Sequence, residues 1–251
     1  VILSHHNLLS NIEAIRMVIR LQNHDNLVGV LPYFHSFGFN CGLWLPLTAG
    51  AAVSCIPNPL DAAQVAQSIR THRATILFAP PTFLLNYTRR AAPSDFHSLR
   101  LIVCGAEKLN PHLAQAFLRQ FNLPILEGYG ATELAPVVSF NIPDVVIDGV
   151  TQIGSKSGTV GRPLPGIAAM IVDPDTFEPI ADDRPGLLLI KSPAAMRGYL
   201  YMPEKTRQAF HNEWYITGDI AKCDADGFLT ITDRLARFSK IGGEMVPHQG
   251  I

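Results

Sequence analysis

The sequence predicts an α/β fold, in which a doubly wound, mostly parallel sheet is followed by a small antiparallel β-sheet or barrel. Over roughly residues 1–140, short apolar runs alternate with helical spacings, an order typical of parallel strands joined by helices. Beyond residue 140, short alternating strands are separated by proline and glycine turns, which favours an antiparallel sheet. We therefore expect an α/β subdomain over residues 1–140 and a β-rich subdomain over residues 141–232.

In the first subdomain, apolar spacing and end signals place each element. Ser4 is a capping residue for a helix whose apolar positions recur every three or four residues as far as Ile19. Gly50 is placed to end a later helix, and Asp61 to cap the next one. The expected strands cover residues 26–31, 51–56, 75–78, 99–104 and 123–126, and the expected helices cover 4–19, 39–48, 61–72, a segment after 80–81, and 111–121.

In the second subdomain, turn formers separate strands that are only three to five residues long. Pro185-Gly186 and Asp226-Gly227 are typical turn pairs between alternating runs. The expected strands cover residues 168–172, 187–191, 221–223 and 228–231.

The composition argues against some classes of partner and provides enough apolar residues for a well-buried core. The 251 residues are 47% hydrophobic and 16% charged, with a net charge of −1, so we expect no nucleic-acid partner. The four scattered cysteines are typical of reduced thiols in a cytosolic protein. Residues 26–60 contain no Asp, Glu, Lys or Arg, but prolines and glycines interrupt the run, which favours a buried strand-helix-strand over a membrane span.

The segment Glu127-Gly128-Tyr129-Gly130-Ala131-Thr132-Glu133 combines three chemical groups that suit a nucleoside triphosphate. Its glycines let the backbone turn tightly and approach a ligand, and Tyr129 offers a flat face to a planar ring. Thr132 is a donor for a phosphate oxygen, and Glu133 is an oxygen ligand for Mg2+. The alternative is a glycine turn after a strand, with a solvated Thr-Glu pair.

Further candidate residues are spread along the chain. His35 lies in an aromatic, glycine-containing loop, where a histidine is more often a structural or hydrogen-bonding residue than a catalytic one. Gly105-Ala106-Glu107 ends a strand and either lines a ligand or forms an ordinary turn. Asp219, in a glycine turn after Tyr215, suits paired hydroxyls such as those of ribose. Asp233-Arg234 either adds a contact to that sugar or forms a local salt bridge, and Lys240 lies in a polar, glycine-rich loop.

Taken in this order, the motifs resemble those of the adenylate-forming superfamily of acyl-CoA and acyl-carrier-protein synthetases, luciferases and peptide-synthetase adenylation domains. The resemblance covers essentially the whole chain. It includes the aromatic-histidine motif at Pro32–His35, the signature at Glu127–Glu133 and the ribose motif at Tyr215–Asp219. Within the superfamily, the segments around His35, Cys104–Leu109, Ile125–Ser139 and Lys240–Val246 are most similar to the bacterial acyl-[acyl-carrier-protein] synthetase / 2-acylglycerophosphoethanolamine acyltransferase branch.

The resemblance implies a role for each nucleotide-binding residue. Tyr129, together with Gly105 to Glu107 and Gly128, frames the adenine. Thr132 contacts the α-phosphate, and Glu133 holds Mg2+.

It also implies roles for residues outside the signature segment. Asp219 and Arg234 hold the ribose, and His35 gates the acyl or carrier-arm channel. Lys240 to Glu244 join the surface used in the second step, after an interdomain hinge rotates. Residues 233–251 are expected to form this hinge, which starts at Asp233-Arg234, and the start of a C-terminal domain. The implied cofactors are ATP, or AMP as its product, and Mg2+.

The implied reaction joins a fatty acid to AMP and then passes the acyl group to the thiol of acyl-carrier protein or CoA, with a link to lysophospholipid re-acylation at the cytoplasmic face of the bacterial inner membrane. The alternatives are a soluble acyl-CoA synthetase and a non-catalytic AMP-binding relative. The family's phosphate loop is expected before Val1 and its adenylation lysine after Ile251. We therefore expect the 251 residues to be the central fragment of such an enzyme, binding AMP weakly without turnover.

Overall fold

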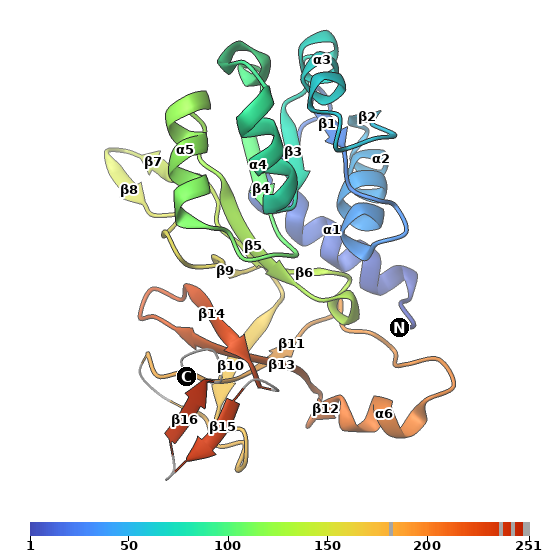
Figure 1. The fold of residues 1–251 in the computed structure, drawn as a ribbon. Helices are drawn as coiled ribbons and strands as arrows, with labels where there is room; N and C mark the ends of the chain where they lie inside the picture. The colour runs from blue at the N-terminus through green and yellow to red at the C-terminus, as the bar shows by residue number, and fades with distance from the viewer. Residues whose placement is uncertain (181–182, 236–237, 242–243, 248–251) are drawn as a thin grey trace.

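Two large β-sheets, packed against hydrophobic cores, organise the chain in the computed structural model (Figure 1). The structure describes residues 1–180, 183–235, 238–241 and 244–247, the last two ranges as backbone only. Helices flank the first sheet, and the second sheet, below it in Figure 1, is antiparallel. The predicted fold class, a mostly parallel α/β sheet followed by a small antiparallel sheet, is confirmed.

The first sheet has seven strands, of which the first five in spatial order run parallel. The last two strands pair antiparallel to their neighbours, so the sheet changes direction after its fifth strand. In spatial order the strands are β2 (Ala52–Cys55), β1 (Asn26–Gly29), β3 (Ile76–Ala79), β4 (Leu101–Cys104), β5 (Leu126–Gly130), β6 (Val137–Phe140) and β9 (Arg162–Pro163).

Alternating side chains on the central strands build a core on each face of this sheet. Ile76 and Phe78 of β3 belong to the cluster that contains the first helix, whereas Leu77 and Ala79 belong to the opposite cluster. The helical elements on the first face are α1 (His5–Ile19), η1 (Gly38–Trp44) and α2 (Leu45–Ala49), and those on the second are α3 (Ala62–His72), α4 (Pro81–Arg90), η2 (Pro93–Phe96) and α5 (Pro111–Phe121).

Local end signals are confirmed at most helices. Ser4 forms a capping box with Asn7 at the start of α1, and Asp61 caps α3 through the amide of Gln64. The single helix expected over residues 39–48 is instead a π-helix, η1, followed by α2. Pro46 has no N–H to donate to the preceding turn, and the amide of Leu45 reaches back five residues to Asn40 O.

The second sheet is antiparallel throughout and carries one longer strand than expected. β13 (Trp214–Cys223) spans ten residues and includes the segment that the sequence placed in a turn. The other strands are β10 (Ala168–Val172), β11 (Gly186–Lys191), β12 (Phe210–His211) and β14 (Leu229–Arg234), and α6 (Pro203–Gln208) precedes β12.

Two hairpins, β7–β8 (Val145–Ile147 and Val150–Gln152) and β15–β16 (Phe238–Ile241 and Glu244–Pro247), lie outside the two larger sheets. Because β9 joins the first sheet, that sheet extends beyond the predicted boundary at residue 140. The division into subdomains at residues 140 and 232 stays a prediction. None of the helices in the described ranges is both long and apolar enough to cross a membrane.

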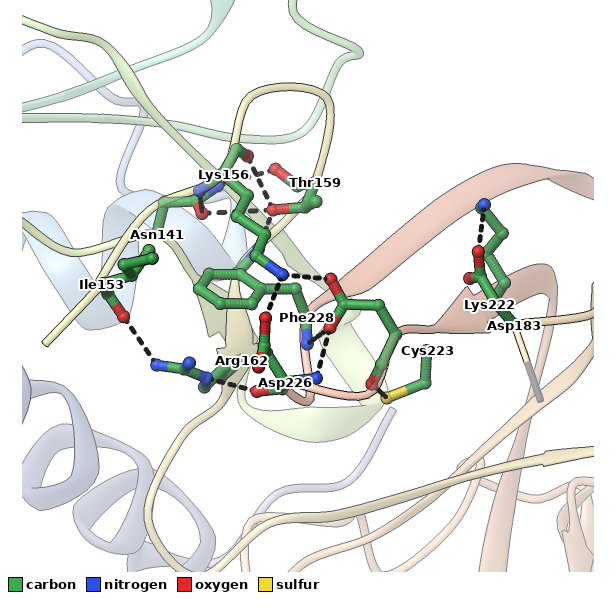
Figure 2. A network of polar contacts seen from close by, with 12 residues as sticks. Asn141, Ile153, Lys156, Thr159, Arg162, Asp183, Lys222, Cys223, Asp226 and Phe228 are labelled. Carbon is green, nitrogen blue, oxygen red and sulfur yellow. Dashed lines mark hydrogen bonds and ion pairs between the residues drawn. The ribbon is translucent and has the colours of Figure 1, made fainter. Parts of the chain in front are cut away.

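A polar joint ties the turn between β13 and β14 to the segment that leads into β9 (Figure 2). The Lys156 ammonium lies 2.6 Å from a carboxylate oxygen of Asp224 and 2.6 Å from one of Asp226. The Arg162 guanidinium lies over the Phe228 ring, 4.1 Å from its centroid, and Nε donates to Asp226 O. The joint therefore fixes the hairpin that carries β13 and β14 against the edge of the first sheet.

A buried carboxylate fixes the start of the first sheet. Asp25 is only 1% exposed, and both of its oxygens accept hydrogen bonds from Arg100, at 2.9 and 2.6 Å. Thr75 and the Gln22 amide also donate to it. Burial alone would raise the pKa of Asp25, but these bonds outweigh it and lower the pKa from 3.8 to about 2.

We predict that Asp25→Asn lowers the free energy of unfolding near neutral pH by about 2.5 kcal/mol, which corresponds to that fall in pKa. Because the folded-state pKa lies below the unfolded one, the contribution is complete above about pH 4 and is lost as the pH falls toward 2. Urea unfolding of both proteins at pH 7 and pH 2.5 measures this. Glu13→Gln, which removes an exposed pair with Arg16, is the control and should change stability by less than about 0.5 kcal/mol.

Candidate functional site

A cavity of about 540 Å³ lies where the ends of β4 and β5 face β13 and β14 of the second sheet. Its size falls within the range of small-molecule sites. Most of the predicted binding residues line it, although they are up to 200 positions apart in the chain. The predicted site residues on its wall are His35, Gly105, Ala106, Gly128, Tyr129, Gly130, Thr132, Glu133, Asp219 and Arg234.

The Gly128-Tyr129-Gly130 segment is part of strand β5, so the expectation of a tight glycine turn is wrong. A Cβ atom on Gly130 would lie 2.2 Å from Pro136 O, and one on Gly128 would lie 2.7 Å from the Cβ of Phe140. The glycines therefore allow β6 and the segment before it to approach β5 closely.

A hydrogen bond across the cavity joins the two sheets. The Tyr129 hydroxyl donates to Asp219 Oδ2 at 2.5 Å, and Arg234 Nε lies 3.1 Å from Asp219 Oδ1. Asp219 is 6% exposed, and Arg234 is its partner in the register of β13 and β14. Burial, and then the charge of Asp219, raise the pKa of Tyr129 well above its ordinary value, so the hydroxyl keeps its proton and donates.

Asp219 lies within β13, not in a turn, but the predicted glycine is still needed. Gly218 has φ +73°, and the pairing of β13 with both β11 and β14 shifts register close by. Such a bulge re-aims the side chain that follows it. The Thr217 hydroxyl accepts from the Asp219 amide at 3.0 Å, which holds this irregular backbone in place.

Thr132 and Glu133 lie on a single 3-10 turn, η3 (Thr132–Leu134), at the end of β5. The Thr132 hydroxyl is 2.9 Å from the Ser36 hydroxyl, in the loop that also carries His35. Glu133 Oε1 accepts from the Tyr199 hydroxyl at 2.9 Å. Burial, and then this bond, raise the pKa of Tyr199.

A pair of buried amides fixes the segment that follows η3. Asn11 Nδ2 donates to Val137 O at 2.6 Å, and Asn40 Nδ2 donates to Ala135 O at 2.7 Å. Asn40 also donates to Asn11 Oδ1, so the two side chains form one network behind the turn. The network connects α1 and η1 to the backbone between β5 and β6.

Buried apolar side chains form the inner wall of the cavity. Burial raises the pKa of both cysteine thiols there, so they stay neutral and serve as packing surface rather than as nucleophiles. The cavity thus combines a polar mouth with an apolar inner end, a combination that suits a ligand with one charged and one apolar part. The apolar residues are Ile15, Phe37, Cys41, Phe78, Val103 and Cys104.

Comparison with known proteins decides the family. A family model described as AMP-binding enzyme matches residues 1–200. The chain belongs to the AMP-binding enzyme family.

Two curated relatives show the range of the matched proteins. The chain is 33% identical over 238 residues to a long-chain-fatty-acid–CoA ligase of Escherichia coli O6:H1, covering 92% of this chain and 41% of that protein. It is 30% identical over 254 residues to a probable 4-coumarate–CoA ligase 3 of Dictyostelium discoideum, covering 98% of this chain and 44% of that protein. The chain therefore spans less than half the length of the curated relatives it matches.

Solved structures of similar proteins have the same fold as this chain. ATP-bound MatB of Rhodopseudomonas palustris superposes with a TM-score of 0.85 at 29% identity, covering 98% of this chain and 47% of that one. The O-succinylbenzoate Coenzyme A synthetase MenE of Bacillus subtilis in complex with AMP has a TM-score of 0.85 at 23% identity, covering 99% and 49%, and shows the likeness of fold alone. Each of these two neighbours was solved with an adenine nucleotide bound.

Three of the predicted site residues need separate comment. His35 lines the cavity and is exposed, and its Nδ1 accepts from the Phe37 amide at 3.2 Å. Glu107 is not part of the cavity wall, and its carboxylate accepts from the Thr82 hydroxyl. Lys240 has its backbone in β15, and its side chain lies outside the described part of the chain.

Sequence reasoning missed Ser36 and Tyr199, which touch the two key residues of η3. The sequence did contain a signal for Ser36, since this residue directly follows the predicted site residue His35. Tyr199 had none, because it is 66 positions from Glu133 and no local pattern connects them.

We predict that Gly130→Ala lowers the free energy of unfolding by about 1–3 kcal/mol, because the new Cβ meets the Pro136 carbonyl and forces β5 and β6 apart. Gly105→Ala is the control, since its Cβ would make only ordinary contacts, the nearest at 3.5 Å to Phe37. Urea unfolding of the three proteins measures the difference. Equal stability of Gly130→Ala and Gly105→Ala would contradict the close approach.

Proposed function

We propose that the chain is the nucleotide- and acyl-binding part of an AMP-forming ligase that joins a carboxylic acid to a thiol. The observation that carries the proposal is a cavity whose wall combines Tyr129, Asp219 and Glu133 with buried apolar side chains. The CoA ligases among the relatives support the same class of reaction.

In the proposed first step, a carboxylate oxygen of the acid attacks the α-phosphorus of ATP. The bond from that phosphorus to the bridging oxygen breaks, pyrophosphate leaves with the electron pair, and an acyl-adenylate remains. Tyr129 offers its ring to adenine, and Asp219 with Arg234 binds the ribose hydroxyls. Thr132 donates to an oxygen of the α-phosphate, the group at which the displacement takes place.

Glu133 fits a role in holding Mg2+. Among the described residues, no group of three or more His, Cys, Asp or Glu side chains is arranged as a metal site. Mg2+ is commonly held by one or two carboxylates together with phosphate oxygens, and the Glu133 carboxylate lies on the cavity wall beside Thr132. When bound, the ion would neutralise charge on the phosphates, and the protein would supply one oxygen ligand.

In the proposed second step, a thiol attacks the acyl carbonyl of the adenylate and AMP leaves. We propose CoA as the acceptor, because the similar curated relatives are named CoA ligases. Several finer points rest on the sequence resemblance and stay predictions. They are a carrier-protein thiol as acceptor, lysophospholipid re-acylation, a location at the cytoplasmic face, a gating role for His35 and a second-step role for Lys240. Inactivity of the 251 residues alone also stays a prediction, which robust fatty-acid-dependent pyrophosphate exchange would overturn.

A second candidate is a binding protein that holds AMP without catalysis. The same cavity supports it, since Tyr129, Asp219 and Arg234 on its wall can bind a nucleotide without taking part in a chemical step. Pyrophosphate exchange by a longer chain that includes both flanking regions separates the candidates, and comparison of CoA with acyl-carrier protein in that chain decides the acceptor.

We predict that Asp219→Ala weakens binding of a stable acyl-adenylate analogue at least tenfold, because the variant loses a charged acceptor and leaves the Tyr129 hydroxyl without its partner. Calorimetry with the analogue measures the dissociation constant. Glu204→Ala is the control, since that exposed carboxylate pairs only locally with Arg207. An unchanged dissociation constant in Asp219→Ala would remove the ribose assignment.

A further inference from the structure

The segment Met196–Tyr199, between β11 and α6, lies against η3. The Met196 amide donates to the Glu133 carbonyl at 2.7 Å, and the Tyr199 hydroxyl donates to the Glu133 carboxylate at 2.9 Å. Glu133 is therefore held at both its backbone and its side chain by residues more than 60 positions away. We call this segment the 196–199 strap.

Contacts with α1 and the N-terminal residues fix the strap from its other side. Asn7 Nδ2 donates to Pro193 O and Ala195 O, both at 2.8 Å. The Ile2 amide donates to Gly198 O at 2.8 Å, and the Arg197 amide donates back to Ile2 O at 2.9 Å. Backbone hydrogen bonds thus anchor the strap, and the buried Asn7 amide anchors the residues that lead into it.

Tyr199 itself is oriented on two sides. Its amide donates to the hydroxyl of Thr206, a residue of α6, at 2.9 Å. The Lys205 ammonium lies over its ring, 4.7 Å from the centroid. The hydroxyl therefore points to Glu133 because the backbone and the ring are both fixed, and no large rearrangement is needed to form the bond.

The hydrogen bond from Tyr199 restricts the orientation of the Glu133 carboxylate. A carboxylate on a one-turn helix has three rotatable bonds, and a hydrogen bond to Oε1 fixes the direction in which the other oxygen points. Mg2+ demands near-ideal octahedral geometry, so a ligand that is already oriented binds it more tightly than a mobile one. Partners of metal ligands are known to have this effect.

We propose that Tyr199 is a positioning residue that orients the Glu133 carboxylate toward a divalent cation bound to the nucleotide phosphates. The inference rests on the proposed function and adds a residue of the 196–199 strap to the phosphate end of the site. A purely structural Tyr199 would affect nucleotide binding equally with and without metal. A positioning Tyr199 affects only the part of binding that depends on metal.

The test measures binding of ATP to the 251-residue chain by calorimetry in EDTA and in Mg2+, and affinity for Mn2+ of the ATP complex by electron paramagnetic resonance. The variants are Tyr199→Phe, which removes only the hydroxyl, Glu133→Gln, and the two combined. Tyr201→Phe is the matched control, because that tyrosine is 93% exposed and does not line the cavity. Thermal unfolding verifies that each variant is folded. If Tyr199→Phe is unstable, Glu133→Asp tests the same coupling between Tyr199 and Glu133, because the shorter side chain draws the carboxylate away from Tyr199.

We expect Tyr199→Phe to weaken Mn2+ binding to the ATP complex about tenfold while metal-free ATP affinity stays within about twofold. In the Glu133→Gln background the same change should add nothing, because the two residues act as one unit. Equal losses with and without metal, or additive losses in the double variant, would overturn the proposal. Failure of the unaltered chain to bind ATP in either condition would instead overturn the proposed function, and this inference with it.

Discussion

The hydrogen bond from Tyr129 to Asp219 is the interaction on which the site depends. It joins β5 of the first sheet to β13 of the second, over 90 positions of sequence, at 2.5 Å. A bond this short requires the two sheets to keep a fixed spacing, since a shift of about an ångström would break it. The polar joint around Lys156 and the amide network of Asn11 and Asn40 hold the parts on either side of that bond.

Close backbone approach is the second constraint, and it explains why glycines stand beside the tyrosine. β6 can lie against β5 only where no Cβ intervenes, and this brings Pro136, Val137 and Phe140 to the cavity wall. The same sheet then presents apolar side chains to the inner end and polar ones to the mouth. One strand with two glycines thereby sets both the shape and the polarity of the site.

Features that depend on neighbouring residues could be predicted from the sequence. The caps at Ser4 and Asp61 and the strand expected over residues 75–78 depend on local sequence, and they are confirmed. The π-helix over Gly38–Trp44 and the strand conformation of Tyr129 and Asp219 could not be predicted, because partners far along the chain determine them. The role of Tyr199 could not be predicted from the sequence for the same reason. The order of the motifs along the chain still predicted that these distant segments form one site, because that order reflects a fold that no single motif reveals.

The central claim is that one nucleotide lies between the two sheets and contacts both. Hydrogen–deuterium exchange of the 251-residue chain, with and without saturating AMP, tests it most directly, because exchange reports each segment separately. The account predicts that peptides covering residues 126–133 and 214–223 slow together, while those covering the β7–β8 hairpin do not change. Slower exchange in only one of the two segments, or in neither, would contradict a shared site.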